Sequence, residues 1–154
     1  MYEIQSRWKP EQDGLRYYGL RNRPFLFQNT VKLTKQQRAV VAKLPCELIA
    51  IGTNAIATSA MLKAGASMGA TGENPVIVAC RTADIIVGPI GILAADSMLG
   101  EITPAMAAAV GRSSAKKLLL PVNLCNNIVV GTQSLSLSAV LDEAVEILRK
   151  ILTV

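Results

Sequence analysis

From residue 33 onward the chain alternates short runs centred on apolar residues with segments whose apolar residues recur at helical spacing. The clearest runs of the first kind are residues 47–51, 84–88 and 116–121. Strands that are apolar on both faces are typical of a parallel sheet covered by helices on both sides. The alternation therefore predicts an α/β fold with a mainly parallel sheet.

Capping residues indicate where the intervening helices begin and end. Asn74-Pro75 and Thr103-Pro104 each combine a capping side chain with proline at the first helical position, and Gly65 is suited to a left-handed helix end. The predicted helices are 34–43, 53 or 54 to 64, 74–81, 90–99, 103–110 and one that begins at residue 136 or 138. Residues 76–78 would also suit a strand, and residues 127–130 predict a weaker fourth strand.

The length of 154 residues allows one domain with a buried core. The three cysteines lack the C-x-x-C spacing of a zinc or redox site, which indicates reduced thiols. The chain has no unbroken apolar run long enough to cross a membrane, and its first residues lack the basic and then apolar pattern of a secretory signal. We therefore predict a cytoplasmic protein that does not bind membranes.

The residues that follow the predicted strands form the candidate site, because ligands of open parallel sheets bind beyond the carboxyl ends of the strands. Two of these loops precede helix starts, where free N–H groups attract anions. The candidate ligand-binding residues are Gly52, Thr53, Asn54, Gly88, Gly91 and Asn123. The alternative interpretation is that the glycines form turns and that Thr53 or Asn54 caps a helix. The sequence leaves both interpretations open.

The absence of histidine limits the chemistry that the chain can perform. It excludes Ser-His-Asp and Cys-His hydrolysis and the H-E-x-x-H zinc motif. Neither the Walker motif G-x-x-x-x-G-K-[ST] nor the dinucleotide motif G-x-G-x-x-G occurs. Among the acids in the middle of the chain, which include Glu73, either Asp96 or Glu101 could act as a base or a metal ligand, but such acids more often cap helices or face solvent. Cys80 and Cys125 fit small core positions better than nucleophiles. We predict no metal site and no specific catalytic residue, and the sequence leaves enzymatic activity open.

Three stretches within residues 47–131 carry a resemblance to a known family: AIGTNAIATSAMLKAGA, GATGENPVIVACRTADIIVGPIGILAADSMLGEITPAMA and AKKLLLPVNLCNNIVVG. GPIG and GEITP are their most specific parts. The chain resembles a bacterial family catalogued as domain of unknown function 3842. This resemblance implies a Rossmann-like three-layer α/β fold with a mainly parallel sheet, and it implies no particular activity.

The N-terminal segment departs from the pattern of that family. Its members resemble one another in an apolar first strand and a turn of the type D-G-x-G-G-G-x-G, where this chain has DGLRYYGLRNRPFLFQNTVKL. Residues 1–43 also hold nine Lys or Arg against three acids, and all six aromatic residues lie within the first 27. We predict that residues 1–32 are an atypical basic, aromatic-rich segment, substituted or frame-shifted, before a single α/β domain at 33–154. The first strand would then be altered or missing, and Phe25-Leu26-Phe27 is the one run there able to fill its position.

Two functions fit these features. The first is binding of a small anionic ligand, most plausibly a nucleotide, at the carboxyl edge of the sheet. The second is a non-enzymatic interaction subunit or homo-oligomer without a small-molecule ligand. A role in binding nucleic acid would depend on the basic N-terminal segment alone, so we do not expect it.

Overall fold

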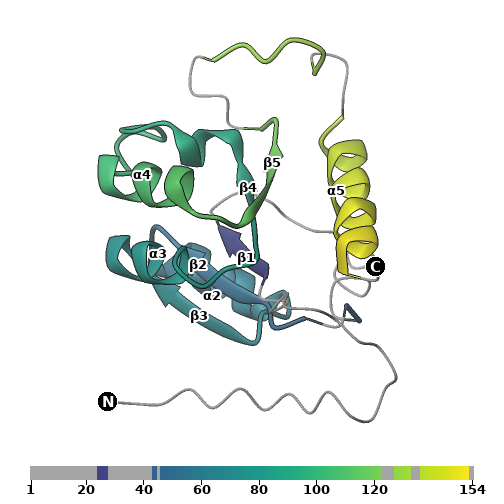
Figure 1. Cartoon of the computed structure of the whole chain (residues 1–154), viewed down its shortest axis with the longest axis horizontal. Helices are drawn as coiled ribbons and strands as arrows, with labels where there is room; N and C mark the ends of the chain where they lie inside the picture. Colours follow the sequence, from purple (N-terminus) through teal and green to yellow (C-terminus); the bar gives the residue numbers. More distant parts are fainter. Residues whose placement is uncertain (1–23, 28–42, 45, 123–126, 133–135, 153–154) are drawn as a thin grey trace.

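The computed structural model describes residues 24–27, 43–44, 46–122, 127–132 and 136–152, and it places a five-stranded parallel sheet at the centre of the chain (Figure 1). The strand order across the sheet is β3-β2-β1-β4-β5. The strands are β1 (Pro24–Phe27), β2 (Ile49–Gly52), β3 (Met68–Thr71), β4 (Ile85–Pro89) and β5 (Lys116–Leu120). The predicted α/β fold with a parallel sheet is therefore confirmed.

Helices connect and cover these strands. They are α2 (Ala55–Lys63), α3 (Glu73–Ala79), α4 (Pro104–Arg112) and α5 (Leu137–Leu152), and a short 3₁₀ helix η1 (Ile90–Leu93) follows β4. The helix predicted at 34–43 lies outside the described residues, apart from Lys43, which is in a turn. Within the described part of the chain, no helix is both long enough and apolar enough to cross a membrane.

Strand β1 comes from the atypical N-terminal segment and lies in the middle of the sheet. Phe25 pairs with Ile49 of β2 on one side and with Ile86 of β4 on the other, both in parallel register. The first strand is therefore present, and Phe25-Leu26-Phe27 fill it as the sequence predicted. The division of the chain at residues 32 and 33 remains a prediction.

The two faces of the sheet bury different helices, because successive residues of a strand point to opposite sides. Ile51 and Ile86 pack with residues of α3 and α4, whereas Ile85 and Val87 pack with Leu148 and its neighbours on α5. Helix α2 lies on the same face as α5. A Cβ built on Gly52 or Gly69, which alternate with the residues facing α3 and α4, would meet side chains of α2. Figure 1 shows α3 and α4 on one side of the sheet and α5 on the other, which makes three layers.

Side chains cap three of the helices as the sequence predicted. The side-chain oxygen of Asn54 accepts from the N–H of Ala57 at 3.0 Å, and the Thr103 hydroxyl accepts from Met106 at 3.2 Å. The Ser136 hydroxyl likewise accepts from the N–H of Ala139, just before α5. Each of these bonds satisfies an N–H that the helix itself leaves without a partner. Gly65 has a φ of +116°, as expected for a left-handed helix end.

The structure differs from the sequence predictions at five places. Strand β3 was not predicted. The α3 region is a helix and not the alternative strand, but this helix begins after Gly72 and not at a cap on Asn74. The predicted helix 90–99 is limited to η1, because several following residues have positive φ. Residues 127–130 form no strand. Gly111 lies within α4 and does not end it.

Candidate functional site

The loops that follow β2, β3 and β4 leave the sheet at the same edge, because all the strands are parallel. The chain order reverses between β1 and β4: β2 and β3 lie on one side of β1, while β4 and β5 lie on the other. Connections that diverge from such a point leave a crevice outside the carboxyl ends of the strands, where ligands of open α/β sheets bind. The described residues that follow the strands at this edge are 52–54, 72–73 and 90–103.

The first of these loops contains three of the predicted site residues. Gly52 ends β2 and is required for packing, since a Cβ there would lie 2.5 Å from the Thr58 hydroxyl and 2.8 Å from the Thr58 nitrogen. Thr53 donates its hydroxyl hydrogen to Glu101 Oε2 at 2.7 Å. Asn54 caps α2. The turn-and-cap interpretation thus accounts for Gly52 and Asn54, whereas Thr53 contacts a different loop.

The other predicted residues are placed differently. Gly88 was expected just beyond the end of the strand, but it is buried inside β4, opposite Leu119. Gly91 is buried in η1, and its carbonyl oxygen accepts from the Ser97 hydroxyl at 2.6 Å. Asn123 lies outside the described residues. Gly91 therefore supports the loop that follows β4, while Gly88 belongs to the sheet.

Two side-chain hydrogen bonds join the loops across long stretches of sequence. The bond from Thr53 to Glu101 joins the loop after β2 to the loop between η1 and α4. The Thr103 hydroxyl donates to the carboxylate of Glu73, which joins the start of α4 to the start of α3. The segment before α4 therefore contacts the loops that follow both β2 and β3, and these three loops form one connected rim.

The segment 96–100 of this rim has an uncommon backbone. Asp96, Met98 and Leu99 have φ between 56° and 60°, in the left-handed region, and Gly100 follows at 86°. Left-handed backbone costs a non-glycine residue roughly 1–3 kcal/mol, and such strain is concentrated at functional sites. The N–H of Asp96 bonds to the Ile102 carbonyl at 2.8 Å, which closes the segment into a loop. The Leu99 side chain is fully exposed on it.

The side chains and helix ends of the rim are better suited to binding a molecule than to nucleophilic attack. Glu73 and Glu101 supply carboxylate oxygens that already accept hydroxyl hydrogens. Helices α2 and α4 begin here and carry no acidic residue in their first turns, so their N-termini retain a partial positive charge. Among the described residues, no three His, Cys, Asp or Glu side chains are grouped in a way that could hold a metal ion.

The two cysteines that the structure describes lie away from this chemistry. Cys80 is buried in the core cluster between the sheet and α3 and α4. Burial raises the pKa of the Cys80 thiol above its usual value, and Lys117 acts against that shift without reversing it. Burial also raises the pKa of Cys46. Both thiols are therefore protonated near neutral pH, and Cys80 lies in the core as predicted. Cys125, for which the same prediction was made, lies outside the described residues.

Glu73, Glu101 and Thr103 form the contacts between loops, yet none was among the predicted site residues. In the sequence, Glu73 and Glu101 stand out only as acidic residues in the middle of the chain, and Thr103 only as a helix cap. A sequence signal did exist: each lies within a few residues of a predicted strand end or helix start. What the sequence could not show is that the loop after β4 folds back toward β2 and α3.

A family model described as Domain of unknown function (DUF3842) matches residues 31–153. The chain therefore belongs to this family, as the resemblance of its central motifs predicted. No curated protein and no solved structure matches it. The match begins just after β1, so the strand that completes the middle of the sheet lies outside the matched range.

Proposed function

We propose that this member of the DUF3842 family binds a small anionic ligand, with a nucleotide as the leading class, in the crevice at the carboxyl edge of its sheet. Support comes first from topology. The strand order β3-β2-β1-β4-β5 is that of the first five strands in the doubly wound dinucleotide-binding fold. It supports a Rossmann-like architecture, in which the ligand crevice would lie at the β1–β4 reversal.

The observation that carries the proposal is the hydrogen bond from Thr53 Oγ1 to Glu101 Oε2 at 2.7 Å. It joins residues 48 positions apart in two loops that face the crevice. The contact between Thr103 and Glu73 adds the third loop. A rim whose loops are fixed to one another by polar side chains is preorganised, and preorganisation lowers the free-energy cost of binding.

The charges of the rim suggest how a nucleotide would lie in it. Carboxylates repel phosphate, so Glu73 and Glu101 are unsuited to the phosphate groups. They are suited to sugar hydroxyls, which would donate to them as the hydroxyls of Thr53 and Thr103 now do. The phosphate would lie at the N-terminus of α2, where helical N–H groups point outward and the first turn holds no acidic residue. The Glu101 carboxylate, which accepts from Thr53, lies beside this helix end and would face the sugar. A nucleotide carries both kinds of group, whereas a simple inorganic anion carries one.

Thermal unfolding of the full chain with a panel of AMP, ATP, NAD⁺ and inorganic phosphate tests the proposal. A ligand at a hundred times its Kd stabilises a protein by about 2.7 kcal/mol, which raises Tm measurably. We expect at least one nucleotide to raise Tm more than phosphate does. A panel in which no compound raises Tm would contradict the proposal.

Two variants locate the binding. Thr53→Val keeps the shape of the side chain but removes the hydroxyl that bonds to Glu101, so we expect a much smaller nucleotide-induced rise in Tm. Thr82→Val is the control, because Thr82 is an exposed threonine in the turn after α3, at the opposite edge of the sheet. Equal responses of the two variants would show that the nucleotide binds somewhere else.

The alternative function, an interaction or oligomeric subunit, is favoured by a different feature. This feature is a groove on the outer side of α3 and α4, away from the crevice.

A further inference from the structure

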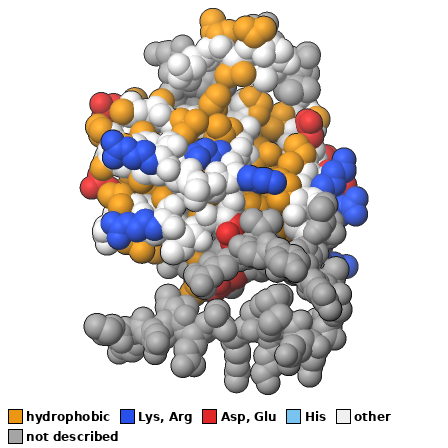
Figure 2. Space-filling view, in the orientation of Figure 1, with side chains coloured by type: hydrophobic (Ala, Val, Ile, Leu, Met, Phe, Trp, Pro, Cys, Tyr) orange, Lys and Arg blue, Asp and Glu red, His pale blue; other side chains and the backbone are white. Residues whose placement is uncertain are grey.

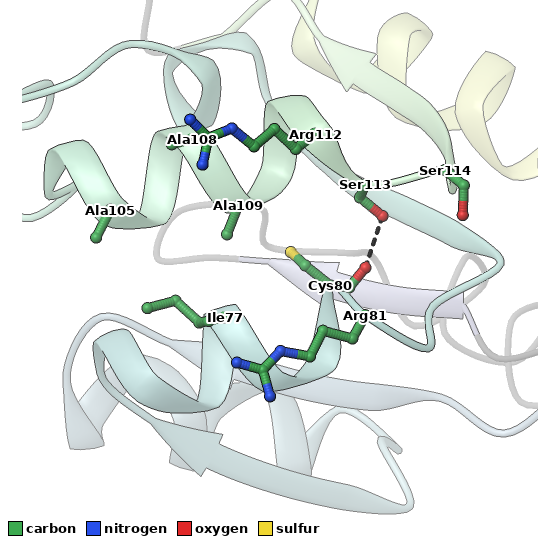
Figure 3. Close-up of a pocket in the computed structure, with 9 residues that line it drawn as sticks. All are labelled: Ile77, Cys80, Arg81, Ala105, Ala108, Ala109, Arg112, Ser113 and Ser114. Carbon is green, nitrogen blue, oxygen red and sulfur yellow. Dashed lines mark hydrogen bonds between the residues drawn. The ribbon is translucent and has the colours of Figure 1, made fainter.

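A groove of about 610 Å³ runs between α3 and α4 on the side that faces away from the sheet. Figure 3 shows Ile77 of α3 pointing toward α4, and Ala105 and Ala109 of α4 pointing toward α3. Arg81 and Arg112 flank the groove from the C-terminal ends of the two helices. Its floor reaches Cys80, whose carbonyl oxygen accepts from the Ser113 hydroxyl at 2.7 Å.

The middle of this groove lacks the polar residues of a solvated helix surface. Helix α4 has the sequence PAMAAAVGR and carries no charge before its last residue, Arg112. A surface helix normally presents charged or polar residues on its outer side. Val78 of α3 is also about half exposed, at 47%. Figure 2 shows hydrophobic side chains and separate groups of Lys or Arg over the α3 and α4 side of the molecule.

Charges of opposite sign lie toward the two ends of α3 and α4. Glu73 and Ile77 are spaced by four residues and therefore lie along one side of α3, and Arg81 lies in the turn that follows this helix. Helices α3 and α4 run in the same direction, because both follow parallel strands and cover the same face of the sheet. Arg81 and Arg112 are therefore at one end, and Glu73, in contact with Thr103, is at the other.

We propose that the α3–α4 groove is the interface for a second copy of this chain, related to the first by a two-fold axis. Such an axis through the middle of the groove makes the helices of the two copies antiparallel. Arg81 and Arg112 of each copy then approach Glu73 of the other, while the uncharged middles of the two grooves face each other. Contacts of this kind are self-complementary, as a two-fold dimer requires. The alanines of α4 allow the helices of the two copies to approach closely. The inference does not depend on the proposed ligand.

Sedimentation of the full chain at a series of concentrations tests the dimer, which should have about twice the 16.4 kDa mass of the chain. Ala108→Glu places a charge in the middle of the groove and should weaken the dimer. Ala60→Glu is the matched control, an exposed alanine on α2 at the opposite face of the sheet. A monomeric wild-type chain, or equal dimer strength in the two variants, would overturn the proposal. Equal dimer strength would mean that the copies associate through another surface.

A pair of charge variants tests the antiparallel geometry, even if Ala108→Glu fails to fold. Arg81→Glu with Arg112→Glu makes both ends of the groove acidic, and Glu73→Arg makes both ends basic. Each variant alone should raise the dimer dissociation constant by roughly tenfold or more, because like charges then face each other. An equimolar mixture should restore association as a heterodimer. A mixture that stays as weak as its components would overturn the two-fold arrangement.

Discussion

The N-terminal ends of α3 and α4 and the groove between their outer sides differ in character, although Glu73 lies where the two surfaces meet. At the carboxyl edge of the sheet, hydrogen-bonding side chains hold residues 30 and 48 positions apart in contact, and the backbone between them has left-handed residues. The outer groove is lined mainly by small apolar side chains and is flanked by Arg81 and Arg112. The rim holds its loops in a fixed arrangement, which suits the proposed ligand. The small side chains of the groove allow another surface to approach closely, which suits the proposed dimer.

Both surfaces depend on the same core, so the largest effect should come from a buried residue of an interior strand. Ile86 is fully buried in β4 and packs against the layer of α3 and α4. Ile86→Ala should lower the free energy of unfolding by about 2–5 kcal/mol. Leu119→Ala, at a partly buried position of the edge strand β5, should cost less. Urea unfolding measures the free energy of unfolding of both variants. Near-neutral effects at both positions would show that the packing described for these strands is wrong.

Two glycines should distinguish the crowded rim from the open outer side of α4. Gly52→Ala would press a methyl group onto Thr58 and should destabilise the fold by about 1–3 kcal/mol. Gly111→Ala meets no atom within 4 Å and lies in α4 without positive φ, so it should stabilise by about 0.4–1 kcal/mol. Thermal unfolding compares the two directly. The same sign of effect in both would contradict this difference in packing.

Loss of the helix cap at Thr103 should lower the stability by a smaller amount and should disturb only the rim. Thr103→Ala removes the bond to the Met106 N–H and the contact with Glu73, and a lost N-cap costs about 1 kcal/mol. Thr103→Ser keeps a hydroxyl and is the control. Urea unfolding should show a loss for alanine and little change for serine; equal losses would mean that the hydroxyl forms no useful bond.

The smallest effect concerns pH and the buried thiol below the groove. Because burial raises the Cys80 pKa above its usual 9.0, the folded chain holds this proton more tightly than the unfolded chain does. The resulting stabilisation is complete below pH 9.0 and is lost as the pH rises past that value through the raised pKa. Unfolding free energies measured from about pH 7 to about pH 10 should therefore fall more steeply for the wild type than for Cys80→Ala. The same pH dependence in the wild type and in Cys80→Ala would contradict the burial of this thiol.

The sequence predicted the elements that have strong local signals. Strands β2, β4 and β5 are apolar runs, and α2, α4 and α5 have capping side chains. Strand β3 has the sequence MGAT, which contains one β-branched residue and lies exposed at the sheet edge, so no pattern indicated it. It pairs in parallel with β2, and this pairing, not its own sequence, accounts for its extended conformation.

The position of the candidate residues at one edge of the sheet was predictable, but their contacts were not. Parallel strands put Thr53 and the start of the segment after β4 at one edge, as expected. The contacts of Glu101 and Glu73 depend on the left-handed residues Asp96, Met98 and Leu99. Aspartate adopts this conformation more often than most residues, but methionine and leucine do not normally indicate it. A helix predicted through residue 99 would have carried Glu101 away from the loop after β2. The backbone of that segment therefore decided which acids face Thr53 and Thr103.

Mapping amide chemical shifts in the ¹⁵N-labelled full chain during titration with AMP and NAD⁺ tests the central claim most directly. The account predicts that at least one of these nucleotides shifts resonances of residues 52–54, 72–73 and 96–103, and leaves those of Ile77, Arg81 and Arg112 unchanged. Shifts confined to the groove, or no shifts with either nucleotide, would contradict the assignment of the ligand site to the carboxyl edge.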